Sequence, residues 1–270
     1  MMKTIVTTLK NVALTTDTGP RPSYDPMIIP GVLLRHDYRN PHTVAQTGAI
    51  VQGTPISDLA VYGAQRAGSA VINSGTIVRE AGGLRFSQPS GYSRQDYINA
   101  GQNPLTSVTH DLLVIAWVRN GTVDYDGVLG VGNAFNDNGA DNVFHTILMS
   151  GSSFAQVHDQ GRAGRGIGLG PALSRTAWTQ IAYSVQFGGA GAVLRGYQSG
   201  ALVTEQTVAG MTALASSALP LTVGASGPGN QSDAATLIVH VEDLTASGQA
   251  PLARVQRDYA LVGAVPAASL

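Results

Sequence analysis

Carboxylate side chains are the first residues to consider, because hydrolysis of a glycosidic bond needs two of them, one on each side of the scissile bond. The chain has three glutamates, Glu80, Glu205 and Glu242, and none has a second acidic residue two positions away. Asp124 and Asp126 would share one face of a strand, but they lie beside a turn, where solvated carboxylates are common. We therefore expect that the protein is not an enzyme, and a hydrolase acting through these two aspartates is the weaker alternative.

Asparagine and aspartate are concentrated in residues 133–145, NAFNDNGADNVFH. Their side-chain oxygens are the kind of ligand that Ca²⁺ binds. However, Ala134 occupies the first ligand position of a calcium loop, and the closing bidentate glutamate is absent. Asn, Asp and Gly also form ordinary loops by bonding to their own backbone. The sequence thus leaves a calcium site and a plain loop open, and it predicts no other cofactor. The candidate ligand-binding residues in this segment are Asn136, Asp137, Asn138, Asp141 and Asn142.

A glycine-rich segment, DQGRAGRGIGLGPAL over residues 159–173, adds Arg162 and Arg165 to the candidate ligand-binding residues. It does not complete the phosphate-binding pattern G-x-G-x-x-G, because Leu169 stands at the last glycine position and no βα unit precedes it. We expect a flexible loop at the rim of the domain, or an interface element that a neighbouring subunit orders.

Histidine and cysteine offer little further chemistry. The histidines have no H-x-x-x-H spacing, and His145, His158 and His240 fall within strand patterns, where we expect structural roles. The chain has no cysteine, which excludes disulfides and thiolate metal sites. No G-x-S-x-G nucleophile motif is present.

Composition indicates β-structure with a sparsely charged surface. Charged residues make up 12% of the 270 residues, roughly half the ~25% of an average soluble domain. The net charge of −1 gives no field to attract nucleic acid or anionic lipid, and no apolar run of ~18 residues could span a membrane. We therefore predict binding to neither nucleic acid nor membrane. So little charge also suggests that the surface is buried against partners.

Short β patterns with turn signals between them fill the centre of the chain. Apolar residues at 252, 255, 259 and 262 predict one helix, over residues 251–262. Because helical crossovers are almost absent, the strands are expected to form an antiparallel two-sheet sandwich, an all-β fold. The predicted strands cover residues 31–38, 83–87, 96–101, 111–120, 126–132, 143–150, 153–159, 178–187, 192–200, 202–208, 219–226 and 235–245.

The sandwich is predicted to have an extension at each end. Four prolines fall within residues 20–30, and proline removes backbone donors, so residues 1–30 are expected to form an extended N-terminal arm. The sandwich would cover residues 31–247, and residues 248–270 would form a C-terminal helix and tail. Trp117 and Trp178 are expected to fill the core of the sandwich rather than stack on sugars. Gly200 is expected to take a positive φ in a tight hairpin.

The ordered series of motifs resembles the concanavalin A-like, laminin-G-type jelly roll. WTQIAYSV (178–185) and LRGYQSGALV (194–203) are similar to its core strand and to the next strand, which ends in Y-x-N/S-G-x-L. Similar upstream blocks are GGLRFSQPSGYSRQDYINAG (82–101) and LLVIAWVRNGTVDYDGVLGVGN (112–133), and similar closing blocks are PLTVGAS (220–226) and IVHVEDLTAS (238–247). The resemblance implies a fold that serves lectins, peptide-binding modules, glycosidases and inert spacers, so the fold alone does not give the function.

A jelly roll behind a proline-rich arm, with no catalytic constellation, resembles the accessory proteins of bacteriophage particles. We expect a non-enzymatic structural or adhesion protein of a phage-like virion, such as a head fibre, decoration, tail or baseplate protein. The arm would bind other virion proteins, the chain would form a homo-oligomer, and the loops would bind cell-surface glycan. The alternative is a free-standing bacterial carbohydrate-binding lectin module, calcium-dependent and located outside the cell or on its surface.

Overall fold

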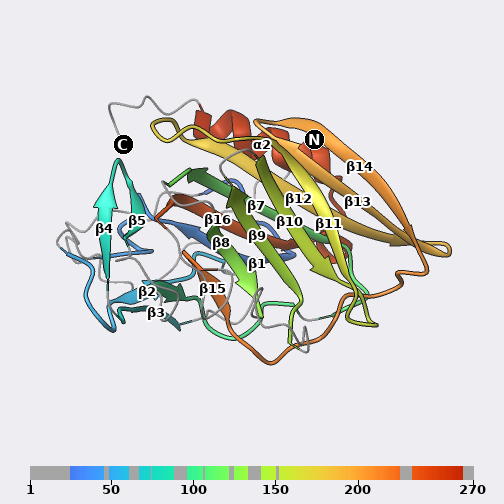
Figure 1. Ribbon diagram of the computed structural model, residues 1–270, viewed down its shortest axis with the longest axis horizontal. Coiled ribbons are helices and arrows are strands. Elements are labelled where there is room, and N and C mark those ends of the chain that lie inside the picture. Colours follow the sequence, from blue (N-terminus) through green and yellow to red (C-terminus); the bar gives the residue numbers. More distant parts are fainter. Residues whose placement is uncertain are drawn as a thin grey trace, which may run out of the picture.

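The structure is a computed structural model that describes residues 25–45, 49–60, 67–73, 75–87, 96–105, 107–121, 125–132, 141–149, 152–225 and 233–263. Most of the regular structure in these ranges is β-strand (Figure 1). The elements are β1 (Val32–Asp37), β2 (Pro55–Ser57), β3 (Ala67–Val71), β4 (Thr76–Glu80), β5 (Gly83–Ser87), β6 (Tyr97–Asn99), β7 (Leu112–Arg119), β8 (Tyr125–Val131), β9 (Phe144–Met149), β10 (Ser152–His158), β11 (Gly164–Pro171), β12 (Thr179–Gly188), β13 (Gly191–Gln198), β14 (Ala201–Ala209), β15 (Leu221–Val223), β16 (Ala235–Asp243), α1 (Leu244–Ser247) and α2 (Pro251–Gly263).

The strands form two sheets that stack as a sandwich. The first sheet has the order β14-β13-β12-β7-β16-β5-β4, with β1 also paired to β16. The second sheet has the order β11-β10-β9-β8-β15-β6-β3-β2. Neighbouring strands are antiparallel, for example β7 with β12 and with β16. The predicted all-β, antiparallel two-sheet sandwich with a short C-terminal helix is therefore confirmed.

The main core lies between the two sheets and follows the alternation of side chains along each strand. Along β13, Ala192 and Leu194 point into this core. From the second sheet, Phe144 meets Tyr183 of the first sheet edge to face, with ring centroids 6.3 Å apart. Full burial of a large apolar side chain contributes about 1.5–3 kcal/mol, so contacts of this kind hold the two sheets together.

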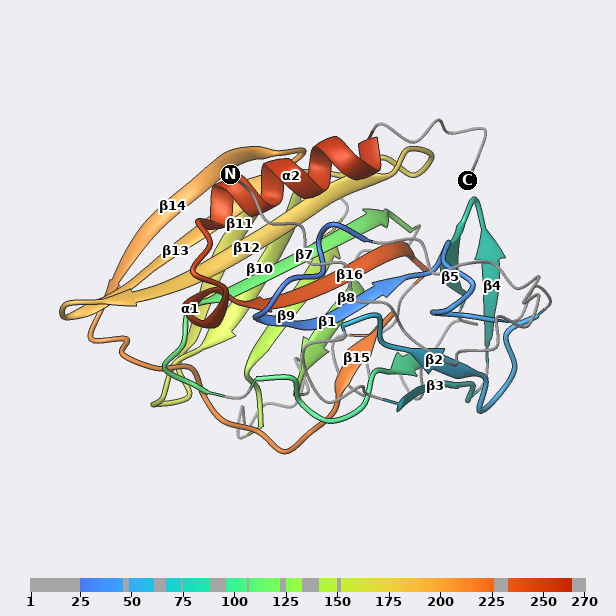
Figure 2. The same cartoon turned by 180° about the vertical axis from the view of Figure 1, so that it is seen from behind.

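The opposite, outer face of the first sheet is covered by α2 and by the residues that lead into β1 (Figure 2). Met27, Tyr197 and Val255 are buried there in a second apolar cluster. Trp117 of β7 lies in a third cluster, and its ring stacks on that of Tyr259 at a centroid distance of 5.8 Å. The helix therefore closes the outer face of the sheet over its central strands.

Charged side chains lie on the buried face of α2. Arg254 is 2% exposed and Asp258 is 0% exposed. Arg254 Nε donates to Glu242 Oε2 on β16 at 2.8 Å, and Arg35 Nη1 on β1 donates to Asp258 Oδ1 at 2.8 Å. Arg35 Nε also donates to Asp25 Oδ2 at 2.8 Å. A buried charge costs several kcal/mol unless it is paired, so these pairs determine where the helix docks. We call these five residues the charged layer.

Two carboxylates of the charged layer, those of Asp25 and Glu242, are held ionised by their surroundings. Burial by itself raises the pKa of Asp25, but the charge of Arg35 and the hydrogen bonds from Met27 and Arg35 together outweigh burial and leave that pKa lowered. Burial likewise opposes ionisation of Glu242, yet His240 and Arg254 lower its pKa overall. Burial also lowers the pKa of His240, so this imidazole is neutral at pH 7. Arg254 is therefore the charge that keeps Glu242 ionised at that pH.

Several details differ from the sequence-based expectations. Residues 159–173 were expected to be a flexible loop, but they form a turn and then β11, which pairs with β10. Trp117 is buried as expected, although beneath α2 rather than between the sheets. Met27 is fully buried, so the last residues of the predicted arm pack against the body. Residues 1–24 of the arm lie outside the described residues.

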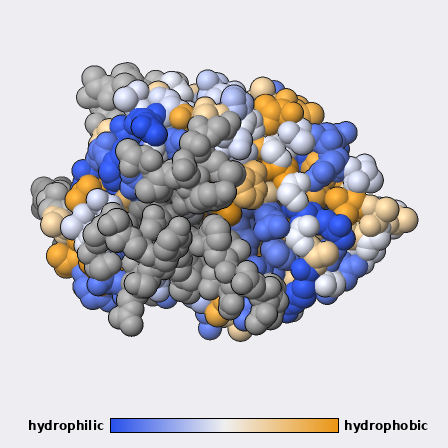
Figure 3. Space-filling view, viewed as in Figure 1, coloured by the Kyte–Doolittle hydropathy of each residue, from blue (hydrophilic) through white to orange (hydrophobic). Residues whose placement is uncertain are grey.

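On the face seen in Figure 3, the coloured residues show hydrophobic and hydrophilic groups intermixed in small areas. Most of the exposed large hydrophobic side chains among the described residues lie on β14 and α2: Leu202, Val203, Leu252, Tyr259 and Leu261. Apolar surface is therefore concentrated on the outer side of the first sheet.

Candidate functional site

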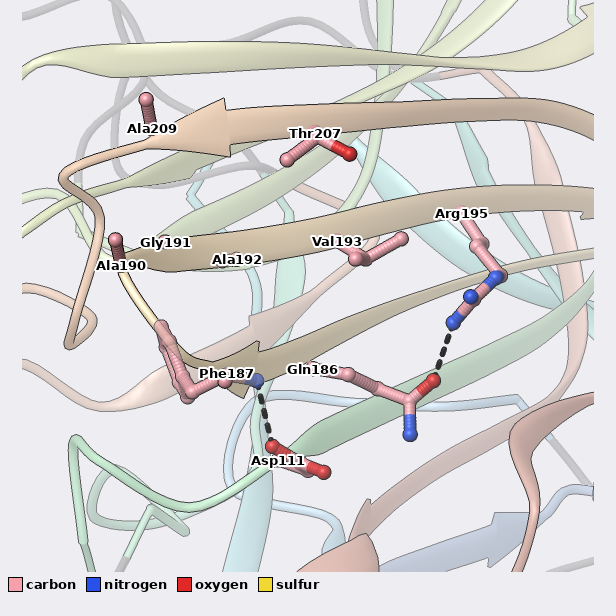
Figure 4. Close-up of a pocket in the computed structure, with 11 residues that line it drawn as sticks. Asp111, Gln186, Phe187, Ala190, Gly191, Ala192, Val193, Arg195, Thr207 and Ala209 are labelled. Atoms are coloured by element: carbon pink, nitrogen blue, oxygen red, sulfur yellow. Dashed lines mark hydrogen bonds between the residues drawn. The ribbon is translucent and has the colours of Figure 1, made fainter.

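Two adjoining cavities lie on the outer face of the first sheet, where β12, β13 and β14 extend beyond α2. One has a volume of about 490 Å³ and lies near the β12–β13 turn (Figure 4). The other has a volume of about 300 Å³ and lies against the start of α2. Gln186 and Arg195 line both cavities. We therefore treat the two cavities as one site, the outer groove, with a polar and an apolar cavity.

The polar cavity is organised around one guanidinium group. Arg195 Nε donates to Glu205 Oε2 at 2.6 Å, and Arg195 Nη1 donates to Gln186 Oε1. Across the cavity, Asp111 Oδ1 accepts a hydrogen bond of 2.8 Å from the backbone N–H of Phe187. Figure 4 shows the Arg195–Gln186 and Phe187–Asp111 hydrogen bonds, with the small residues of the β12–β13 turn. A few polar groups around a small-residue surface are what a site needs to orient a hydroxyl-rich ligand.

The apolar cavity has few polar groups. Tyr197, Leu202, Pro251 and Leu252 line it. Tyr197 is fully buried, and its hydroxyl group lies 3.1 Å from that of Ser184. Tyr197 therefore lies beneath the cavity, and the exposed apolar surface comes from Leu202 and Leu252.

Strand pairing explains why these side chains gather. β13 pairs with β14 so that Arg195 stands opposite Glu205, and opposite charges on directly paired residues attract. The hairpin between the strands has Ser199 at φ 50° and Gly200 at φ 80°. Two positive φ values are typical of a two-residue type I′ turn, which fixes the register. The expected positive φ of Gly200 is confirmed.

The predicted ligand-binding residues that the structure describes lie away from the outer groove, on the second sheet or in its connecting segments. Arg162 is exposed in the turn between β10 and β11 and has φ 68°. Arg165 Nη2 forms an ion pair of 2.7 Å with Asp159 Oδ2. Asp141 is exposed and Asn142 is 4% exposed, both just before β9. The backbone N–H of His158 donates to Val143 O at 2.9 Å, which brings this end of β9 close to the β10–β11 turn. Asn136, Asp137 and Asn138 lie outside the described residues, so ligand binding by these seven residues stays a prediction.

All three glutamates have arginine partners. Glu80 Oε1 lies 2.7 Å from Arg119 Nη2, and Glu80 also pairs with Arg85. Glu205 pairs with Arg195, and the fully buried Glu242 pairs with Arg254. The hydrogen bond from Arg85 is the main cause that lowers the pKa of Glu80, and His240 and Arg254 lower the pKa of Glu242 against the effect of its burial. These two carboxylates are therefore ionised at neutral pH. Of the aspartates in the hydrolase alternative, Asp124 lies outside the described residues, as does the side chain of Asp126.

Metal and membrane sites receive no support from the part of the chain that the structure describes. Within it, no three His, Asp or Glu side chains gather as a metal-binding group. The rings of His145 and His158 meet edge to face at 5.7 Å, and burial lowers the pKa of His158. No helix among the described residues is long and apolar enough to cross a bilayer.

Comparison with protein families gives no match. No family model matches the sequence, and no curated protein matches it.

Solved structures do show a similar fold. The binding domain of botulinum neurotoxin DC in complex with SialylT aligns with a TM-score of 0.59 at 8% identity, covering 86% of this chain and 51% of that chain. The same domain in complex with rat synaptotagmin II aligns with a TM-score of 0.59 at 8% identity, covering 86% of this chain and 52% of that chain. The receptor-binding domain of botulinum neurotoxin type G aligns with a TM-score of 0.53 at 10% identity, covering 86% of this chain and 51% of that chain.

The present chain thus spans about half the length of these binding domains. At such low identity, the likeness shows a shared β-sandwich fold and nothing further. The similarity of the motifs to laminin-G-type domains stays a prediction.

Proposed function

We propose that the protein is a non-enzymatic carbohydrate-binding module whose ligand lies in the outer groove. The observation that carries the proposal is the groove itself, in which Arg195, Gln186 and Asp111 surround a cavity of about 490 Å³. Such a volume lies within the ~300–1,000 Å³ range of ligand sites. The arginine pairing of the glutamates supports a binding role over a catalytic one. The solved sandwiches of similar fold are named as binding domains, which is consistent with this role.

A glycan array of the full chain tests the proposal, with matched arginine variants to locate the site. Arg195 and Arg165 both pair with a carboxylate on their own sheet. Arg195→Ala should weaken sugar binding by about 10- to 100-fold, because hydrogen bonds to a charged group are worth ~1.5–3 kcal/mol. Arg165→Ala should leave binding unchanged.

The outcomes of this experiment separate the two candidate regions. If Arg165→Ala loses sugar binding and Arg195→Ala keeps it, the ligand lies at the loops of the second sheet instead. Loss of sugar binding on addition of EDTA would favour the calcium-dependent lectin. If the wild-type chain binds no glycan on the array, the proposal is wrong.

We further propose that this module serves as an adhesion subunit of a phage-like virion, with residues 1–30 contacting other virion proteins and the chain forming a homo-oligomer. The low charge of the sequence supports burial against partners. Packing of Met27 against the body supports a firm connection between the arm and the sandwich. The mass of the full chain in solution, compared with a chain lacking residues 1–24, tests the role of the arm. If the full chain and the shortened chain are both monomers, the proposed role of the arm in oligomer formation is wrong.

A further inference from the structure

The two cavities of the outer groove share Gln186 and Arg195 and differ in the rest of their lining. Asp111 and Thr207 add polar groups to the polar cavity alone. Leu202 and Leu252 add aliphatic surface to the apolar cavity alone. A ligand with a hydroxyl-rich part next to an apolar substituent would therefore match the groove as a whole.

The charge balance of the groove disfavours acidic ligands. Among the described residues that line the two cavities, Arg195 is the only cationic side chain. Glu205 neutralises it at 2.6 Å, and Asp111 adds a second carboxylate. A carboxylated sugar that reached Arg195 would lie near both of these carboxylates. Such like-charge contacts select against a ligand.

On the basis of the proposed function, we infer that the groove takes a neutral glycan with an acyl substituent, of which an N-acetylated hexose is the simplest example. The sugar hydroxyl groups would lie in the polar cavity. The acyl amide would lie at the boundary, beside Gln186 and Arg195, which line both cavities. The methyl group would contact Leu202 and Leu252.

Four oligosaccharide probes test this inference on the full chain by calorimetric titration. The disaccharide of N-acetylglucosamine is compared with cellobiose, which has the same linkage without acetyl groups. Sialyllactose is compared with lactose to test the effect of a carboxylate. Burial of one methyl group should make the acetylated disaccharide bind about fourfold more tightly than cellobiose. Sialyllactose should bind no more tightly than lactose.

A variant of the apolar cavity tests where the acetyl group lies. Leu202→Ser should abolish the preference for the acetylated disaccharide over cellobiose. Leu202 is 45% exposed, so the change leaves the core intact. Val51→Ser is the matched control, because Val51 is 54% exposed and lies outside the groove. It should keep the preference.

A variant of the polar cavity tests the charge argument. Glu205→Gln removes the carboxylate that neutralises Arg195. This variant should bind sialyllactose several-fold more tightly than the wild-type chain does, while its affinity for lactose changes little.

The failures of the inference and of the proposed function are distinguishable. Equal affinity of the wild-type chain for cellobiose and for the acetylated disaccharide would overturn the inference while sugar binding stands. Sialic acid also carries an N-acetyl group, so binding of sialyllactose by the wild-type chain that exceeds binding of lactose by more than about fourfold would do the same. Binding of no sugar at all would overturn the proposed function itself.

Discussion

At the scale of single residues, Arg35 shows how this chain uses its few charges. Its side chain is 2% exposed, and it pairs with Asp25 on one side and Asp258 on the other. Asp258 Oδ2 also accepts hydrogen bonds from Trp117 Nε1 at 2.6 Å and from Gln180 Nε2 at 2.9 Å. One carboxylate on α2 therefore satisfies donors from three strands.

Asp258→Asn should be strongly destabilising. The change leaves the guanidinium of Arg35 buried with one of its two ionic partners, and breaking a buried pair typically costs ~3–5 kcal/mol. Urea denaturation followed by tryptophan fluorescence measures the free energy of unfolding. Arg257→Gln is the control, because Arg257 is exposed on the same helix and surface substitutions usually change stability by under ~0.5 kcal/mol. Equal stabilities of the two variants would show that the charged layer does not fix α2.

His36 should make stability depend on pH. Burial lowers its pKa from 6.5 to about 3. The unfolded chain therefore binds a proton at this residue below about pH 6.5, whereas the folded chain does so only near pH 3. Stability is then complete above pH 6.5 and falls by up to ~1.4 kcal/mol per pH unit as the pH drops towards 3.

Denaturation midpoints of the wild-type chain and of His36→Gln, measured between pH 7.5 and 4.5, test this dependence. The variant should lose part of the acid sensitivity. His42→Gln, at an exposed position, should keep all of it. If the denaturation midpoints of the wild type and of His36→Gln change with pH in the same way, His36 is not a source of the acid sensitivity.

At the scale of elements, β11 shows why a glycine-rich segment forms a strand here. β11 crosses close to β13, and a Cβ placed on Gly196 would lie 1.9 Å from Gly168 O. Side chains from β13 and β14 bind the backbone of β11, as when Gln206 Nε2 donates to Gly166 O at 2.5 Å. The glycines therefore permit the backbones of the two sheets to approach at this edge.

Gly196→Ala should force these backbones apart. Overpacking of this kind costs ~1–3 kcal/mol, which thermal unfolding followed by circular dichroism detects. Gly166→Ala is the matched control, because a Cβ there would meet nothing within 4 Å. If the two variants unfold at the same temperature, the backbones of β11 and β13 do not approach each other as closely as described.

The strength of local patterns decided which elements could be predicted from the sequence. The strands β7, β12 and β13 have strong apolar patterns and were predicted at nearly their observed bounds. The three-residue β2 and the glycine-rich β11 lack such patterns, and their pairing depends on distant strands. A helix was predicted over residues 251–262 because its apolar period is clear, and the observed helix is Pro251–Gly263. That its buried face carries Arg254 and Asp258 could not be predicted, because the partners come from distant strands.

The outer groove was missed for a related reason. Gln186 and Arg195 lie on adjacent strands, and which face of the sheet α2 leaves open depends on the charged layer. The alternation along β13 could have placed Arg195 and Tyr197 on one face, opposite Leu194. It could not have shown that this face remains accessible.

At the scale of the whole molecule, a binding module should gain stability from its ligand and leave the ligand unchanged. At a free sugar concentration of ~100 times Kd, the free energy of unfolding should rise by ~2.7 kcal/mol. Differential scanning calorimetry with the N-acetylglucosamine disaccharide measures the rise, and mass spectrometry of the recovered sugar tests for cleavage. Arg195→Ala is the control, and it should show little rise at the same sugar concentration. Cleaved sugar would show that the protein is a hydrolase after all.

The placement of arginines and acids beneath α2 has a kinetic consequence. A surface with little net field cannot steer a partner from a distance, so encounters should proceed at an unassisted rate of ~10⁵–10⁶ M⁻¹s⁻¹. Those rates should also change little with ionic strength. A protein of this kind holds its target by slow release or by several simultaneous contacts, rather than by rapid capture.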